Sequence, residues 1–244
     1  MGNRNNLDIN NFINFLFQKY KIKEEEKELI LKIIKPIIEH PEFQRRCTSK
    51  FLHHGSITLG EHILEDTIVT YKLSRKYLKN KNYNIDAALK IAMFHDLYTI
   101  PWQNNKEQAK VKRFFNKHGF RHPLEAVINA YTWYTELFDD KKIIIDGILH
   151  HMYPLPVTCL TKEAELKNND LVKKLPEDII HYIIDSTNRG RIWKISLARS
   201  KFKEGRIMAK ADRYVSFRQI KNFSNLVSLL TGYNKKLKKN EFKD

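Results

Sequence analysis

Histidine and aspartate are the residues of this chain that could do chemistry, and they fall in five short segments. These segments read HHGSITLGEH at 53–62, FHD at 94–96, HGFRHP at 118–123, HHMYP at 150–154 and KADR at 210–213. Imidazole nitrogens and carboxylate oxygens are good ligands for first-row divalent metals. A single His-Asp pair is a weak signal, but each of the other segments also places a His or an Asp on or at the end of an expected helix. The set therefore favours a metal centre.

Other catalytic and nucleotide-binding motifs are absent from the sequence. It has no CxxC pair for zinc, no GxGxxG after a strand and no GxSxG nucleophile turn. Gly55 and Gly60 have the spacing of a phosphate-binding P-loop, but Glu61 and His62 stand where Lys and Ser or Thr are needed. A Walker loop is therefore excluded, and the histidines remain the main signal.

The elements that must position these residues are helices. Hydrophobic residues recur at three- and four-residue spacing nearly throughout, while glycine (8) and proline (7) are scarce among the 244 residues. No strand alternation is long enough to build a sheet, so we expect an all-α fold of one domain. The helices expected from this pattern cover 10–20, 24–39, 60–80, 85–97, 123–138, 140–152, 177–184 and 204–222.

Prolines and turn residues mark where these helices should begin or break. Pro36 should kink its helix or mark its break. Pro123 suits the first position of a helix, which predicts that His122 is the cap and that its side chain points off the helix end. Three further prolines interrupt 153–203, and DSTNRG at 185–190 is typical of a turn.

The composition is that of a globular protein with a basic balance. Hydrophobic residues make up 42% of the chain, and 44 Lys and Arg against 28 Asp and Glu give a net charge of +16. The lysines are spread along the chain, so we interpret them first as solvated helix faces, with a phosphorylated substrate or a nucleic acid as alternatives. The N-terminus lacks the apolar segment of a signal peptide, and no apolar run approaches the ~18 residues of a membrane helix. We expect a cytoplasmic protein with no membrane partner.

The histidine and aspartate pattern resembles that of the HD superfamily of metal-dependent phosphohydrolases. In that family a His, then a His-Asp pair, then an Asp lie on a bundle of helices. The matching residues are His62 in EHILEDTIV, His95 and Asp96 in AMFHDLY, and Asp212 in KADRYVS. The resemblance covers roughly residues 50–220 and implies that these four residues hold one divalent metal ion.

Many members of the family use two further histidines, which support a second metal. His122 in HGFRHPLEAVINA and His151 in ILHHMYPL occupy those places. We favour His151 over His150 because it precedes Met-x-Pro-Leu, as in the family. The resemblance then implies two divalent ions bridged by Asp96, and Fe, Mn, Ni, Co and Zn are all compatible with this ligand set.

The resemblance also implies a domain organisation. We expect an HD-type phosphohydrolase domain at 50–222, with N-terminal helices at 1–49 packed on it and a C-terminal helix and charged tail at 223–244. The stretch between His151 and Asp212 is longer than in the family, which predicts an insertion or an elaborated substrate wall at 155–203. The expected fold is thus an HD-domain-like helical bundle with one elaborated segment.

The implied activity is hydrolysis of a phosphomonoester or phosphodiester by a metal-activated water, with a nucleotide or another small phosphorylated molecule as substrate. Asp96 is the catalytic residue that bridges the metals, and the general acid or base stays open between His54, Glu61 and His118. Three cations beside the expected ligands are candidates to clamp a phosphate, since guanidinium and ammonium groups neutralise its charge: Lys210, Arg213 and Arg121.

Two other functions remain as alternatives. The chain could be a non-catalytic module that senses a nucleotide, although an intact ligand set favours an enzyme. It could also be a nucleic-acid-binding protein or a nuclease that uses its positive charge. Against that, we find no basic stripe interleaved with aromatics of the kind that single-strand platforms use.

Overall fold

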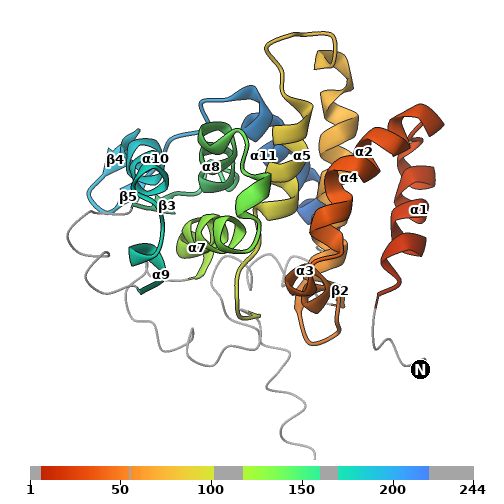
Figure 1. The fold of residues 1–244 in the computed structure, drawn as a ribbon, viewed down its shortest axis with the longest axis horizontal. Coiled ribbons are helices and arrows are strands. Elements are labelled where there is room, and N and C mark those ends of the chain that lie inside the picture. The colour runs from red at the N-terminus through yellow and green to blue at the C-terminus, as the bar shows by residue number, and fades with distance from the viewer. Residues whose placement is uncertain (1–6, 55, 102–117, 160–169, 220–244) are drawn as a thin grey trace, which may run out of the picture.

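The computed structural model describes residues 7–54, 56–101, 118–159 and 170–219, and this part of the chain is predominantly helical (Figure 1). The predicted all-α class is confirmed, because the strands in the described residues are only two or three residues long. None of the described helices is long and apolar enough to cross a membrane.

The centre of the molecule is built from four helices that pack on one another: α4 (Leu59–Ser74), α5 (Ile85–Phe94), α8 (Lys141–Leu149) and α11 (Lys203–Gln219). Helix α4 contacts both α5 and α11, and α8 contacts both α5 and α11. Their apolar side chains belong to one large buried cluster, in which Leu64, Ile91 and Ile148 have no exposed surface. Burial of these side chains is the main force that holds the four helices together.

In the described residues, four further helices and two 3-10 turns lie around this core. Helices α1 (Ile9–Tyr20) and α2 (Glu24–Ile38) pack on α4 and α5, and α3 (Pro41–Arg46) follows them. Helix α7 (His118–Trp133) packs on α8. The 3-10 turns are η1 (Arg75–Tyr77) after α4 and η4 (Thr135–Leu137) after α7.

The described strands form two small antiparallel sheets. Strands β1 (Leu52–His54) and β2 (Ile57–Thr58) pair just before α4, so that β1 lies close to the start of that helix. The second sheet has the order β3-β5-β4, with β3 at Val157–Thr158, β4 at Arg191–Ile192 and β5 at Ile195–Ser196. It belongs to the segment that the sequence marks as elaborated, together with α9 (Asp170–Lys173) and α10 (Glu177–Asn188).

Helix α10 differs from its prediction. The sequence predicts a turn at 185–190, but the helix continues to Asn188. The polar side chains that favour a turn are satisfied within the fold instead. The Thr187 hydroxyl donates to the Ile183 carbonyl at 2.8 Å, and the Ser186 hydroxyl donates to the Asp146 carboxylate at 2.8 Å.

The two prolines both lie inside helices. Of the two alternatives predicted for Pro36, a kink or a break, the break does not occur, because helix α2 runs on past Pro36 to Ile38. The prediction that His122 caps a helix is wrong, because α7 already includes His118 and Pro123 lies inside it. A proline at this place cannot donate a hydrogen bond to the carbonyl four residues earlier, that of Gly119, and its ring crowds that carbonyl.

Candidate metal centre

Buried histidines and aspartates from all four central helices or their ends meet at one place. Helix α4 supplies His62 and, one turn later, Asp66. Helix α5 ends at its C-cap His95, and α11 supplies Asp212. His62, Asp66, His95 and Asp212 each offer a ligand atom within 4.8 Å of the others. These residues lie far apart in the sequence, so only the packing of α4, α5 and α11 brings them together.

Asp96 lies between this group and a second pair of histidines. Its Oδ2 atom faces the Nε2 atoms of His62 at 3.8 Å and His95 at 3.6 Å. Its Oδ1 atom faces the Nε2 atoms of His122 at 3.2 Å and His151 at 3.6 Å. The two oxygens of one carboxylate therefore point to two different sets of imidazoles.

Four histidines of the centre are oriented by a hydrogen bond from Nδ1, the ring nitrogen that does not face Asp96. In each case the partner is an oxygen that can only accept. The Nδ1 atoms of His95, His122 and His151 donate to main-chain carbonyls three or four residues earlier, at 2.7, 3.2 and 2.7 Å. The Nδ1 atom of His62 donates to Oε1 of Gln219 at 3.0 Å. With Nδ1 as the donor, a neutral ring presents its Nε2 lone pair to the centre. Metal-binding histidines show the same arrangement.

Asp66 is a site residue that the sequence analysis missed. Its carboxylate is completely buried, with Oδ2 3.1 Å from Nε2 of His62 and 3.3 Å from Nε2 of His95. The signal that could have found it is the i, i+4 spacing from His62 in HILED, which places both side chains on one face of a helix.

His53 is the second residue that was missed. Its Nε2 atom lies 3.7 Å from Oδ2 of Asp96, and its ring stacks on His62 with centroids 4.2 Å apart. The Tyr98 hydroxyl lies 2.9 Å from its Nδ1 atom. His53, His62 and Asp96 form a further group with the geometry to hold a metal ion. The sequence analysis chose His54 from this histidine pair; the structure places His53 at the centre, and the side chain of His54 lies outside the described part of the chain.

The pKa values in the centre reflect strong charge pairing. Burial opposes the protonation of His62 and His95, but the neighbouring aspartates raise the pKa of His62 to about 10 and that of His95 to about 9. Burial raises the pKa of Asp66 to about 6. The histidines around Asp96 hold the pKa of its carboxyl well below the usual range even though burial opposes this. Without a metal, protonated histidines balance the carboxylates, and those protons must leave when a cation binds.

The pair His122 and His151 differs from His62 and His95 in its protonation. Their Nε2 atoms face each other at 3.0 Å. Burial, with the nearby His122 and His95, lowers the pKa of His151 to about 3, so its ring is neutral. Since both Nδ1 atoms donate to carbonyls, two neutral rings would set one Nε2 lone pair against the other. A cation that accepts both lone pairs removes this repulsion.

The residues of the centre fit a metal ion by two further criteria. Among the described residues, both carboxylate oxygens of Asp66 and Nε2 of His95 are buried without a hydrogen-bond partner, and such atoms are costly to bury. Facing ligand atoms lie 3.0 to 3.8 Å apart. Two ligands at right angles on an ion with bonds of about 2.1 Å would lie about 3.0 Å apart. The set is therefore close to a coordination geometry.

The residues of the centre differ slightly in exposure. His62, Asp66 and His95 are completely buried, whereas His53, Asp212 and His122 are 8%, 7% and 5% exposed.

The other predicted site residues lie around the centre rather than in it. His118 is half-buried, and its ring stacks on His122 with centroids 5.1 Å apart. Burial and the nearby His122 lower its pKa to about 3. His54 is the last residue of β1 and pairs there with Ile57. His150 does not face the centre, because its Nε2 atom lies 3.1 Å from the Ser186 hydroxyl.

The three cations proposed to clamp a phosphate occupy different positions. Lys210 and Arg121 are exposed. Arg213, which follows Asp212 of the centre, is half-buried and donates a hydrogen bond to the main-chain carbonyl of Tyr153. It therefore connects α11 to the segment just after His151.

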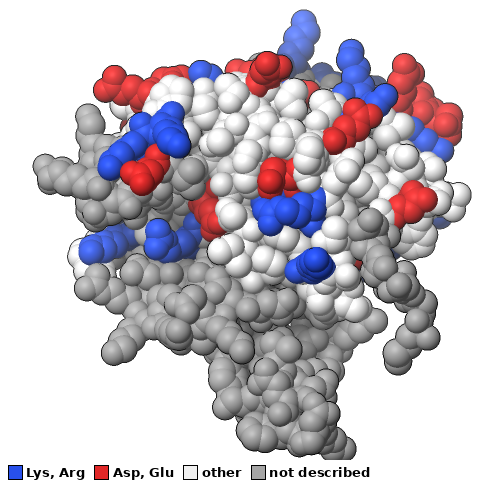
Figure 2. Space-filling view, turned by 60° about the horizontal axis from the view of Figure 1, so that its bottom comes forward, with Lys and Arg blue, Asp and Glu red and all other residues white. Residues whose placement is uncertain are grey.

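On the face that Figure 2 shows, the lysine and arginine side chains of the described residues stand in small clusters, several of them next to acidic ones. On this face they form local groups rather than one continuous basic surface.

Comparisons with known proteins identify no relative of this chain. No protein-family model matches it, no curated protein matches it, and no solved structure matches it. Its function must therefore be inferred from its own residues.

Proposed function

We propose that this protein is a metal-dependent phosphohydrolase with an HD-like centre of two divalent ions, acting on a nucleotide or another small phosphoester. The observation that carries the proposal is the position of Asp96, whose two carboxylate oxygens face different sets of histidine Nε2 atoms. A carboxylate in this position can bridge two ions, as two-metal phosphoester hydrolysis requires.

The proposal assigns ligands to both ions from the residues on each side of Asp96. His62, Asp66, His95 and Asp212 would hold the first ion, with His53 at its edge. His122 and His151 would hold the second. Imidazole and carboxylate ligands without a thiolate suit Fe, Mn, Ni, Co or Zn. A bound divalent metal polarises a phosphoryl oxygen and lowers the pKa of a bound water to about 7.

Residues at the rim would bind the substrate. Arg213 is the best placed of the three cations because its guanidinium is held beside Asp212 and the His151 segment. Planar guanidinium groups pair well with phosphate oxygens. His118 stacks on His122, but burial and His122 lower its pKa to about 3, which makes it a weak base, so we assign it to substrate binding rather than to proton transfer.

The proposal is tested by metal content and turnover in matched variants. Elemental analysis of the purified chain should find about two equivalents of divalent metal, and hydrolysis of p-nitrophenyl phosphate or bis(p-nitrophenyl) phosphate should depend on them. His122→Ala and His151→Ala should each lower the metal content towards one equivalent and sharply reduce turnover. The matched control is His150→Ala, because His150 is equally buried but contacts Ser186 instead of the centre.

Two outcomes would contradict the proposal. If His122→Ala and His151→Ala keep two equivalents, the second ion is not held there. If the wild-type chain binds metal but hydrolyses no phosphomonoester or phosphodiester in a broad panel, the centre belongs to a sensing module or a structural site.

A further inference from the structure

The hairpin formed by β4 and β5 carries an exposed tryptophan at its tip. Ile192 pairs with Ile195, so the loop between the strands is the dipeptide Trp193–Lys194. Trp193 is 70% exposed, and Ile192 beside it is 58% exposed. Figure 1 shows this hairpin at one end of the long axis, opposite α1. A large aromatic side chain in this position contributes little to the core.

The backbone at Trp193 is also unfavourable for its residue type. Its φ is 56°, in the left-handed region that bulky residues rarely adopt. In two-residue hairpin loops with a positive φ at the first position, glycine is the usual residue there. Trp193 thus has a cost in backbone energy that no burial of its ring offsets. Strain of this kind is concentrated at functional positions.

Basic residues are frequent along the hairpin that carries the tryptophan. From Arg189 to Lys203 the sequence holds six basic residues and no acidic one. Arg191, Lys194 and Arg199 are exposed, and Nζ of Lys194 lies 5.2 Å from the centroid of the Trp193 ring. Arg189 is different, because it pairs with the buried Asp146 and helps to fix the hairpin to α8. The tip therefore combines one aromatic face with several positive charges on a fixed support.

We propose that this hairpin, with Arg191, Ile192, Trp193 and Lys194 at its tip and Arg199 at its base, binds single-stranded nucleic acid. An unpaired base would stack on Trp193, and the flanking cations would contact phosphates. Base–aromatic stacking with basic residues along the backbone path is how non-specific single-strand binders work. The sequence analysis found no such stripe, because the basic and aromatic residues become one surface only when the hairpin forms.

A single strand fits this tip better than a membrane does. Membrane binding of a surface element scales with the apolar area it can bury, and here only Ile192, Trp193 and Leu197 are exposed. A base needs only the one flat ring. The site lies outside the metal centre, although β3, which pairs with β5, begins six residues after His151. The proposal is independent of the phosphohydrolase activity.

The test is fluorescence anisotropy of a 5′-fluorescein-labelled dT20 or U20 oligonucleotide with the full chain, in EDTA so that the probe is not hydrolysed. Trp193→Gly is the main variant, because glycine accepts the positive φ and the variant should keep its thermal midpoint. Loss of one stacked base should weaken binding roughly 5- to 150-fold. Phe15→Ala is the matched control: Phe15 is 52% exposed on α1 with Nζ of Lys19 5.6 Å from its ring centroid.

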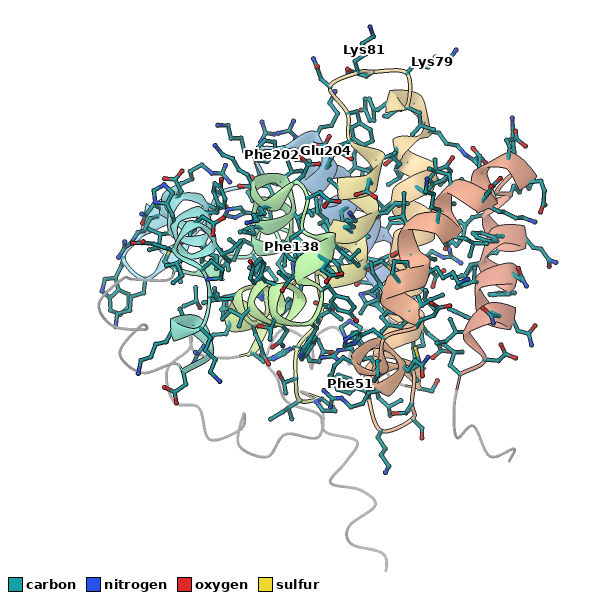
Figure 3. The ribbon with its side chains drawn as sticks, in the orientation of Figure 1. Phe51, Lys79, Lys81, Phe138, Phe202 and Glu204 are labelled. Atoms are coloured by element: carbon teal, nitrogen blue, oxygen red, sulfur yellow. The ribbon has the colours of Figure 1, made fainter. Side chains whose placement is uncertain are left out.

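Charge is tested by a pair of double variants. Lys194→Ala/Arg199→Ala should reduce the slope of log K against log salt by about 1.4, since each phosphate contact on a single strand contributes about 0.7. Lys79→Ala/Lys81→Ala removes the same charge from the loop between α4 and α5 (Figure 3) and should leave the slope unchanged. Wild-type affinity for Trp193→Gly would overturn the proposal. So would binding to phosphatidylserine vesicles without binding to either oligonucleotide, which would make the tip a lipid contact.

Discussion

Asp66→Asn tests most directly whether the buried cluster binds a metal. The substitution keeps the shape of the side chain and removes a charge that lies 3.1 Å from His62 Nε2 and 3.3 Å from His95 Nε2. At 3.1 Å and an effective dielectric constant of about 20, one such charge pair is worth roughly 5 kcal/mol. Removal of one partner from a buried pair costs about 3–5 kcal/mol in practice. The metal-free variant should therefore melt about 6–20 °C lower than the wild type.

The decisive quantity is the further stabilisation that metal provides. If the loss of a charged ligand weakens metal binding 100-fold, the stabilisation of the fold by metal falls by about 2.7 kcal/mol at a fixed metal concentration. For a chain of this size that is about 5–11 °C of the metal-induced shift. Differential scanning calorimetry with and without added Mn²⁺ or Zn²⁺ measures it, and elemental analysis gives the stoichiometry.

The control is Asp146→Asn. Asp146 is also buried, but its carboxylate accepts hydrogen bonds from Ser186, Ser200 and the main-chain N–H of Lys201. This variant should be destabilised while it keeps the wild-type metal-induced shift. If Asp66→Asn also keeps the full shift and the full metal content, Asp66 is only the partner of an ion pair and our assignment of the first ion is wrong.

Three further predictions concern the residues that support the centre. Gln219→Leu removes the acceptor for Nδ1 of His62 and should weaken metal affinity about 10- to 100-fold, measured by competition with a chelating dye, while a variant with unchanged affinity would refute this role. Burial opposes the ionisation of Glu65, but hydrogen bonds, including one from Gln219, hold its pKa below the usual value. Ionised Glu65 therefore stabilises the fold above about pH 4.5, and this contribution is lost as the pH falls through the lowered pKa. If the Glu65 hydrogen bonds are absent from the unfolded chain, acid unfolding of the wild type should begin at a lower pH than that of Glu65→Gln. Gly147→Ala would place a Cβ 2.5 Å from Cδ1 of Ile91 and should cost about 1–3 kcal/mol in urea unfolding, whereas an unchanged midpoint would show that α5 and α8 can separate freely.

The sequence predicts the helices well because their apolar faces are periodic. The first two were expected at 10–20 and 24–39 and occur at Ile9–Tyr20 and Glu24–Ile38. The periodicity shows which face is apolar, but it carries no information on hydrogen bonds made by residues distant in the sequence. Helix α10 is the example, since its last turn is supported by Asp146 from α8.

The site residues divide in the same way. The resemblance to the HD superfamily implied His62, His95, Asp96, Asp212 and the pair His122 and His151 as ligands, and the structure places these side chains together. Two missed residues needed tertiary information. Asp66 is buried only because α5 and α11 cover that face of α4, and the choice between adjacent histidines in β1 depends on which face of a short strand meets the core.

The histidines that follow α5 and α8 would have a consequence for any ion bound at the centre. Both helices end at the centre: His95 is the C-cap of α5 and His151 follows the C-cap of α8, and the two rings are hydrogen-bonded to the Ala92 and Ile148 carbonyls. The carbonyl end of a helix carries a partial negative charge that favours cations. Two such ends directed at one cluster give it an attraction for positive charge that no side-chain substitution removes. Each imidazole also relays this polarisation from its own helix to the Nε2 lone pair, so the backbone acts as an outer coordination sphere.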